Sequence, residues 1–243
     1  MDTGAPSGLG FVLVHGGGMT STMWDPILPL LSQPAVTVDL PGRRYHPADL
    51  ARVTTSDQAA AIASAAEASG FERVVVVGHS SAGFSMPYLP ARLPSLTHLV
   101  FVSCTVAARG WRPVDFLRDD IKELTMNSRD AQLERSRGRT VGGLRTGEPA
   151  ISTDLEVVEN SREAPPYEAP LPLFETAEWP VLPAEIGRTY VIGLRDRVIP
   201  PDLARSMAAC LDPVDLVEVP GGHNPVSDPA PLAEILTTVV AKL

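Results

Sequence analysis

Cysteine, basic residues and long apolar runs are all scarce in this chain of 243 residues. Its 2 cysteines are too few for the disulfide framework of a small secreted domain and do not suggest a zinc site. The 20 Lys and Arg against 29 Asp and Glu give a formal net charge of −9, which disfavours nucleic acid and anionic lipid as partners. No apolar run reaches the length of a membrane span, and the first residues lack the basic start and apolar centre of a secretion signal. We therefore expect a cytoplasmic protein that binds neither nucleic acid nor membranes.

The most informative stretch reads VVVVGHSSAG and spans residues 74–83. Four β-branched residues without polar alternation predict a strand that is buried on both faces, as in a parallel sheet covered by helices. Gly78 and Ala82 lie two positions before and after Ser80, and their small size allows a sharp turn from strand to helix that raises the serine side chain. Centring the pattern on Ser81 would place the bulky His79 in the tight position, so Ser80 is the better candidate nucleophile. The alternative is a helix N-terminus with Ser80 as a cap or an anion site.

A glycine loop follows the first predicted strand, residues 11–14, in the order His15, Gly16, Gly17, Gly18. Without Cβ atoms, its backbone N–H groups can turn toward a ligand, as an oxyanion hole requires. A phosphate-binding loop is the alternative, but neither G-x-G-x-x-G nor a Walker lysine accompanies it. We expect His15 to brace this loop rather than to react.

An acid and a histidine follow two later strands. Asp196 comes two residues after the apolar run 189–194 and before two prolines, and the alternative for it is a surface ion pair with Arg195 or Arg197. His223 follows the predicted strand 214–219 and two glycines that leave its loop free to place the imidazole near Ser80. A serine hydroxyl needs such a base, and the base needs a carboxylate to fix its tautomer.

The order serine, acid, histidine, each after its own strand, resembles that of the α/β-hydrolase family. The resemblance implies an α/β fold with a doubly wound, mostly parallel six-stranded sheet that lacks the family's first two strands and carries a helical cap. It further implies Ser80, Asp196 and His223 as the catalytic residues, the N–H groups of Gly17 and Ser81 as the oxyanion hole, and neither cofactor nor metal. The chain resembles the compact members of the family, which include plant methylesterases, hydroxynitrile lyases and bacterial esterases.

Two core segments, 1–106 and 187–243, are expected to flank a cap at 107–186, where composition changes and prolines accumulate. Cap helices are predicted near 113–126, 128–137 and 154–162. Core helices are predicted at 22–31, at 58–69 and after Ser80. The helix after Ser80 is expected to be kinked or to stop early because of Pro87 and Pro90. The candidate substrate pocket comprises Gly18, Trp111, Phe116, Phe174 and Trp179. The alternative is that these cap side chains only hold the cap onto the sheet.

Four functions compete. The first is hydrolysis of a small or medium-sized carboxylic ester or lactone through an acyl-enzyme. The second is a lyase acting on cyanohydrins, although such lyases carry a lysine just after the histidine, where this chain has Asn224. The third is a thioesterase or cyclase acting on a polyketide-type substrate, and the fourth is a ligand-binding protein without turnover. We expect a small-molecule ester as the binding partner, and the sequence is compatible with a homodimer.

Overall fold

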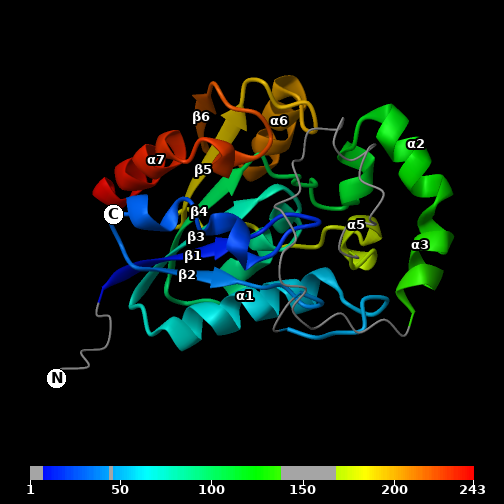
Figure 1. Ribbon diagram of the computed structural model, residues 1–243, viewed down its shortest axis with the longest axis horizontal. Coiled ribbons are helices and arrows are strands. Elements are labelled where there is room, and N and C mark those ends of the chain that lie inside the picture. Colours follow the sequence, from blue (N-terminus) through cyan, green and yellow to red (C-terminus); the bar gives the residue numbers. More distant parts are fainter. Residues whose placement is uncertain (1–7, 44–45, 138–167) are drawn as a thin grey trace.

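The computed structural model describes residues 8–43, 46–137 and 168–243, and they form one six-stranded sheet with helices on both faces (Figure 1). The strand order is β2-β1-β3-β4-β5-β6, and every neighbouring pair is parallel. The strands are β1 (Leu9–Val14), β2 (Ala35–Val38), β3 (Arg73–His79), β4 (Leu96–Val102), β5 (Gly187–Gly193) and β6 (Asp215–Val219). The predicted fold class, a doubly wound parallel sheet of six strands, is confirmed.

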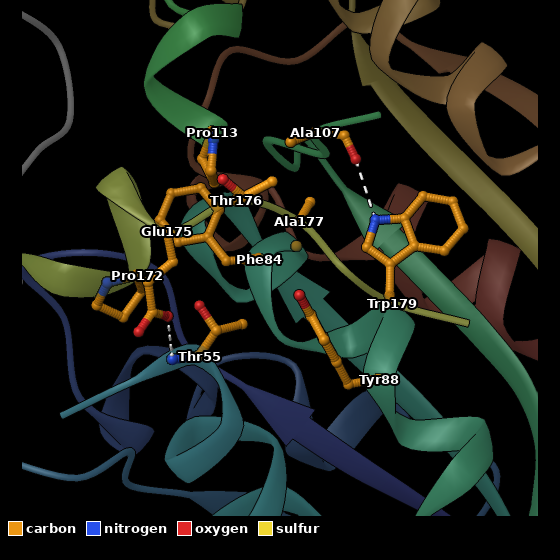
Figure 2. A pocket seen from close by; sticks show the side chains of 11 residues that line it. Thr55, Phe84, Tyr88, Ala107, Pro113, Pro172, Glu175, Thr176, Ala177 and Trp179 are labelled. Carbon is orange, nitrogen blue, oxygen red and sulfur yellow. Dashed lines mark hydrogen bonds between the residues drawn. The ribbon is translucent and has the colours of Figure 1, made fainter. Parts of the chain in front are cut away.

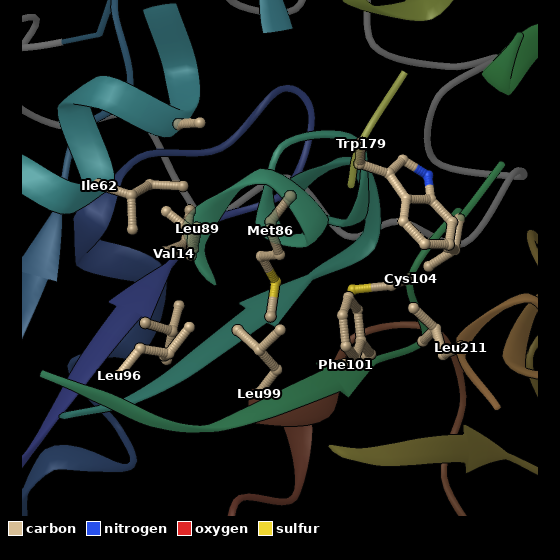
Figure 3. Packing of buried hydrophobic residues seen from close by; sticks show 14 of the residues in the cluster. Val14, Ile62, Met86, Leu89, Leu96, Leu99, Phe101, Cys104, Trp179 and Leu211 are labelled. Carbon is tan, nitrogen blue, oxygen red and sulfur yellow. The ribbon is translucent and has the colours of Figure 1, made fainter. Parts of the chain in front are cut away.

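The valine run forms the centre of β3 and serves both faces of the sheet. Val74 and Val76 pack with Ile62 of α1 and Met207 of α6, whereas Val75 and Val77 pack with helix α7 and with the segment after β1. All four valines are fully buried. Figure 3 shows the first of these two clusters, in which the side chains of β4 and of the turn after β3 meet above the sheet. This double burial explains why the run has no polar alternation.

The α-helices are α1 (Thr55–Ser69), α2 (Asp119–Asn127), α3 (Arg129–Ser136), α5 (Leu171–Phe174), α6 (Pro201–Ala208) and α7 (Ala230–Ala241). Helix α1 begins at a capping box in which Thr54 and Asp57 exchange hydrogen bonds, and it ends at Gly70 with φ of 72°. The helix predicted at 58–69 ends at the same residue, whereas its predicted start is three residues late, because residues 55–57 are of types that also cap helices. No helix among the described residues is both long and apolar enough to cross a bilayer.

Two core segments that the sequence predicts as α-helices form 3₁₀ helices instead. Instead of one helix over 22–31, the structure has two 3₁₀ helices, η1 (Ser21–Trp24) and η2 (Leu28–Leu30). The stretch after Ser80 also forms 3₁₀ helices, η3 (Ser80–Phe84) and η4 (Met86–Ala91), rather than a kinked α-helix. Prolines explain both results, because a proline lacks the N–H that an α-helical turn needs, and 3₁₀ turns tolerate short interrupted runs.

The segment between β4 and β5 contains η5 (Pro113–Phe116), α2, α3 and α5 among its described residues. Helices α2 and α3 agree with the predictions near 113–126 and 128–137, whereas the predicted helix near 154–162 lies outside the described residues. The division into a core and a cap at 107–186 stays a prediction. Two further 3₁₀ turns, η6 (Ala209–Leu211) and η7 (Pro225–Ser227), lie in the C-terminal part of the core.

Candidate active site

Three polar residues from distant parts of the chain meet at the carboxyl ends of the strands. Ser80 follows β3, Asp196 follows β5 and His223 follows β6. Parallel strands end at the same edge of a sheet, so residues that follow them are brought together there. Asp196 and His223 are both buried, at 4% and 7% exposed.

A chain of hydrogen bonds joins the three side chains. The Nδ1 atom of His223 lies 2.8 Å from Oδ2 of Asp196, and its Nε2 atom lies 3.0 Å from Oγ of Ser80. A carboxylate can only accept, so Nδ1–H of His223 donates to Asp196. In the neutral ring Nε2 is then unprotonated, and it accepts from the hydroxyl of Ser80. This tautomer is the one that a base for the serine proton requires.

The carboxylate of Asp196 is fixed on its other side by backbone N–H groups. Its Oδ1 atom accepts hydrogen bonds of 2.8 Å from the N–H groups of Val198 and of Ile199. Within the described part of the chain, neither Arg195 nor Arg197 forms an ion pair with it. The alternative of a surface ion pair is therefore not what the structure shows.

The turn that carries Ser80 is tight, and its neighbours are small for that reason. Ser80 has φ of +51°, a left-handed conformation that costs a non-glycine residue of the order of 1–2 kcal/mol. A Cβ at Gly83 would lie 2.4 Å from the carbonyl oxygen of Thr105, and one at Gly78 would lie 2.9 Å from Cβ of Ala82. The N–H of Thr105 also donates to the carbonyl of Ser80 at 3.1 Å, which ties the turn to the segment after β4. The serine is thus held by packing on both sides.

The glycine loop after β1 lies against this turn. A Cβ at Gly16 would be 2.9 Å from Cβ of Ser80 and 2.7 Å from Nδ1 of His79, and one at Gly17 would be 3.4 Å from Oγ of Ser81. Gly17 and Ser81 are therefore neighbours, as an oxyanion hole built from their N–H groups needs. The assignment of these two N–H groups as the hole stays a prediction.

His15 braces the glycine loop, as the sequence predicts. Its Nε2 atom accepts from the N–H of Leu40 at 3.1 Å, and its Nδ1–H donates to the carbonyl of Gly16 at 2.8 Å. Burial lowers the pKa of His15 to about 4, because a charged imidazole would lose its solvation there. The ring is neutral at pH 7 and connects the loop to the end of β2.

His79 contacts His223 more closely than its sequence context indicates. Its Nε2–H donates to the carbonyl oxygen of His223 at 2.9 Å, and the centroids of the two rings lie 4.8 Å apart. Burial, and then the nearby His223, hold the pKa of His79 well below its usual range. The sequence placed His79 beside the nucleophile, but the bond to His223 joins residues 144 positions apart and leaves no local signal.

An ion pair that the sequence did not indicate lies beside the glycine loop. Arg43, in the turn after β2, pairs through Nη2 with Oε1 of Glu168, and the same oxygen accepts from the N–H of Gly18. The Arg43 side chain is 4% exposed and that of Glu168 is 46% exposed. The Nε–H of Arg43 donates to the carbonyl of Met19 at 3.0 Å, so the guanidinium also holds the end of the loop.

The predicted pocket residues have varied surroundings. Trp111 is 59% exposed and packs edge-on against Phe116 at 6.3 Å between centroids. Phe174 lies under the guanidinium of Arg129, 5.6 Å from its ring centroid, and Gly18 contacts Glu168. A role in the substrate pocket stays a prediction for Gly18, Trp111, Phe116 and Phe174.

Trp179 is packed into the core instead. It is 6% exposed, and its indole N–H donates to the carbonyl of Ala107 at 3.1 Å. Figure 2 shows the cavity that it borders together with Tyr88 and Glu175. That cavity has a volume of about 10 Å³, which is enough for one water molecule but not for an ester. For Trp179 the alternative interpretation, that the side chain holds this segment onto the sheet, fits better.

This arrangement can activate a hydroxyl group. A neutral imidazole accepts from Ser80, a buried carboxylate fixes the ring, and a glycine loop lies beside the turn, so the site has the parts required for attack on a carbonyl carbon. Among the described residues, no group of three or more His, Cys, Asp or Glu side chains is placed to hold a metal ion.

Comparison with known proteins agrees with the fold. Residues 11–235 match a family model described as the alpha/beta hydrolase family. A putative chloroplastic methylesterase 14 from Arabidopsis thaliana is 26% identical over 253 residues, which cover 94% of this chain and 71% of the relative.

Solved structures agree with this result at the level of the fold. An extracellular alpha/beta-hydrolase from a Paenibacillus species, described as sharing structural and functional homology with tobacco salicylic acid binding protein 2, superposes with a TM-score of 0.75 at 19% identity. The match covers 95% of this chain and 98% of that one. A pyrethroid hydrolase from Sphingobium faniae JZ-2 superposes with a TM-score of 0.68 at 21% identity, over 96% of both chains.

Proposed function

Because the chain belongs to the alpha/beta hydrolase family, we propose that it is a serine esterase that hydrolyses small or medium-sized carboxylic esters through an acyl-enzyme. The observation that carries the proposal is the hydrogen-bond chain from Ser80 through His223 to Asp196, at 3.0 and 2.8 Å. The relatives support the ester bond as the target, since one is a putative methylesterase and another a pyrethroid hydrolase.

In the first half of the reaction, Ser80 attacks the ester carbonyl while Nε2 of His223 takes its proton. Asp196 then faces an imidazolium across a hydrogen bond and stabilises its positive charge. The negative charge that develops on the carbonyl oxygen is received by the N–H groups of Gly17 and Ser81, and each such donor is worth about 3–4 kcal/mol in the transition state. His223 next gives its proton to the leaving alcohol, and the acyl group stays on Ser80.

In the second half, water takes the place of the alcohol. His223 removes a proton from the water as it attacks the acyl-enzyme, and the same N–H groups receive the oxyanion. Ser80 leaves with the proton from His223, and the carboxylic acid is released. Each half of the reaction begins with Nε2 of His223 unprotonated, because only then can it accept a proton.

The residue after the histidine weakens the case for a cyanohydrin lyase. Asn224 stands where such lyases carry a lysine, and its Oδ1 atom accepts from the N–H of Val226 at 3.1 Å. It is thus engaged in the turn that begins η7 and offers no positive charge to a leaving cyanide.

The test is turnover of p-nitrophenyl acetate and butyrate by the wild-type chain and by Ser80→Ala. We expect release of p-nitrophenol by wild type and a loss of about 10³-fold or more in kcat for Ser80→Ala. Ser206→Ala, on the exposed face of α6, is the matched control and should behave as wild type. Equal rates for Ser80→Ala and wild type would refute the proposal, and so would a wild-type chain without turnover of any short ester.

A further inference from the structure

We propose that Arg43 and the N–H of Gly18 form a carboxylate-binding subsite beside the active site, and that the enzyme therefore prefers esters that carry a second, free carboxylate. Half-esters of dicarboxylic acids have this chemistry. The inference rests on the proposed esterase function and names its substrate class. In this structure the carboxylate of Glu168 occupies the subsite.

Arg43 is a prearranged donor. Its side chain is 4% exposed, its Nε–H is bound to the carbonyl of Met19 at 3.0 Å, and its backbone N–H donates to the carbonyl of Leu40 at 3.0 Å. A guanidinium held in this way keeps its planar array of N–H groups in one orientation, which suits the two oxygens of a carboxylate. Little conformational entropy is lost when an anion binds there.

The carboxylate of Glu168 is replaceable, because its side chain is far more exposed than that of Arg43. The side chain of Arg43 is 4% exposed and is held by the carbonyl of Met19, whereas the side chain of Glu168 is 46% exposed. An exposed glutamate can turn into solvent by a change of rotamer, without movement of the loop. An incoming carboxylate can then restore an acceptor to both N–H groups, whereas a neutral ester offers weaker hydrogen bonds and no opposite charge.

The subsite lies within reach of the nucleophile. A Cβ built on Gly17 would be 3.4 Å from Oγ of Ser81 and 3.8 Å from Oε1 of Glu168, so this one residue lies between the serine turn and the bound carboxylate. A substrate whose ester and carboxylate are separated by a few bonds could therefore place one group at Ser80 and the other at Arg43. The spacing is measurable with half-esters of malonate, succinate and glutarate.

The remainder of the surface gives such substrates no general advantage. The formal net charge of −9 repels anions at long range, so a preference for a half-ester has to come from a local positive site. The two groups at this place act in opposite directions on a substrate carboxylate: Arg43 attracts it, and Glu168 competes for the same donors. Removing the charge of Glu168 should therefore sharpen the preference.

The experiment compares monomethyl succinate with methyl butyrate, in which a methyl group replaces the carboxylate. The readout is the kcat/KM for monomethyl succinate divided by the kcat/KM for methyl butyrate. We expect the ratio to exceed one in wild type and to rise about tenfold in Glu168→Gln, equivalent to about 1.4 kcal/mol. Adding Arg43→Lys to Glu168→Gln should lower the ratio again, because lysine keeps the charge but lacks the planar array of donors. Glu185→Gln, an exposed glutamate of the same segment, should leave the ratio at its wild-type value.

A wild-type ratio below one, or a ratio that Glu168→Gln leaves unchanged or lowers, would overturn the proposal. Failure of the proposed function looks different, because then neither ester is hydrolysed. In that case thermal unfolding decides the question of the subsite. Monomethyl succinate should raise the Tm of Glu168→Gln more than that of wild type, and equal shifts in the two chains would overturn the subsite.

Discussion

The strand ends and the segment between β4 and β5 are held in different ways. At the strand ends, His223 is 7% exposed, both of its ring nitrogens are in hydrogen bonds, and its carbonyl accepts from His79. In the described part of the segment, Trp111 is 59% exposed, and the ion pair between Arg118 and Asp120 lies in solvent. Ser80, Asp196 and His223 are therefore linked by hydrogen bonds that are buried or partly buried, whereas Trp111 and the pair of Arg118 and Asp120 in the segment are exposed. We expect reactivity to depend on the strand ends and selectivity on the segment.

The largest effect should come from Asp196→Asn, set against Asp115→Asn in the segment. Asparagine at position 196 can still accept from Val198 and Ile199, but it no longer fixes the tautomer of His223, and kcat should fall about 10⁴-fold. Asp115 is held by Arg112, which lowers its pKa to about 2, and its loss should leave kcat within about twofold. Steady-state rates with p-nitrophenyl acetate measure both. A kcat for Asp196→Asn within tenfold of wild type would remove the distinction between the regions.

A second comparison sets two tryptophans of the segment against each other. Trp179 is packed in the core beside Cys104 and Leu211, as Figure 3 shows, and Trp179→Ala should lower the free energy of unfolding by about 3–5 kcal/mol. Trp111→Ala, at an exposed site, should change it by about 0.5 kcal/mol or less. Urea denaturation of both variants gives the two values. Similar losses would mean that the outer part of the segment is held as firmly as the core.

Gly16→Ala tests how closely the glycine loop fits the serine turn. The added Cβ would lie 2.9 Å from that of Ser80 and 2.7 Å from Nδ1 of His79, so the nucleophile must move. A displacement of about 1 Å can cost about 10²-fold in rate, and we expect a fall in kcat of that size. Gly17→Ala, whose Cβ would meet only ordinary contacts of 3.4 Å and more, should lose less. An unchanged kcat for Gly16→Ala would show that the glycine loop shifts without displacing Ser80.

The smallest predicted effect concerns pH and stability. Burial lowers the pKa of His98 to about 4, whereas in the unfolded chain it is about 6.5. Between these values the unfolded chain binds the extra proton, so His98 destabilises the fold as pH falls from about 6.5 to 4, by about 1.4 kcal/mol per pH unit at most. His98→Gln should reduce the slope of unfolding free energy against pH in this window and leave it unchanged between pH 7 and 8. Equal slopes for wild type and His98→Gln between about pH 4 and 6.5 would contradict this prediction.

The fold and the meeting of Ser80, Asp196 and His223 could be predicted because the sequence patterns that indicate them are local. The double burial of Val74 to Val77, the capping box at Thr54 and the glycines around Ser80 are each encoded within a few residues. Parallel strands then bring Asp196 and His223 to the edge where Ser80 lies, whatever the length of chain between them.

The features of the site that the sequence did not predict depend on contacts between distant segments. Glu168 meets Gly18 from 150 positions away, and His79 meets the backbone of His223 from 144 positions away, so no spacing in the sequence could indicate either contact. The prediction of pocket aromatics rested on residue type alone, which does not distinguish the exposed Trp111 from the buried Trp179. The prolines after Ser80 predicted an interrupted helix, but their spacing does not distinguish an α-helix that stops early from a run of 3₁₀ turns.

Labelling with a fluorophosphonate, followed by peptide mapping, shows whether His223 activates Ser80. The reagent reacts with a serine only where a base and an oxyanion site activate it. We expect one adduct, on Ser80, in wild type, and none in His223→Gln. An adduct on Ser81 or on any other serine, or equal labelling of His223→Gln, would contradict it.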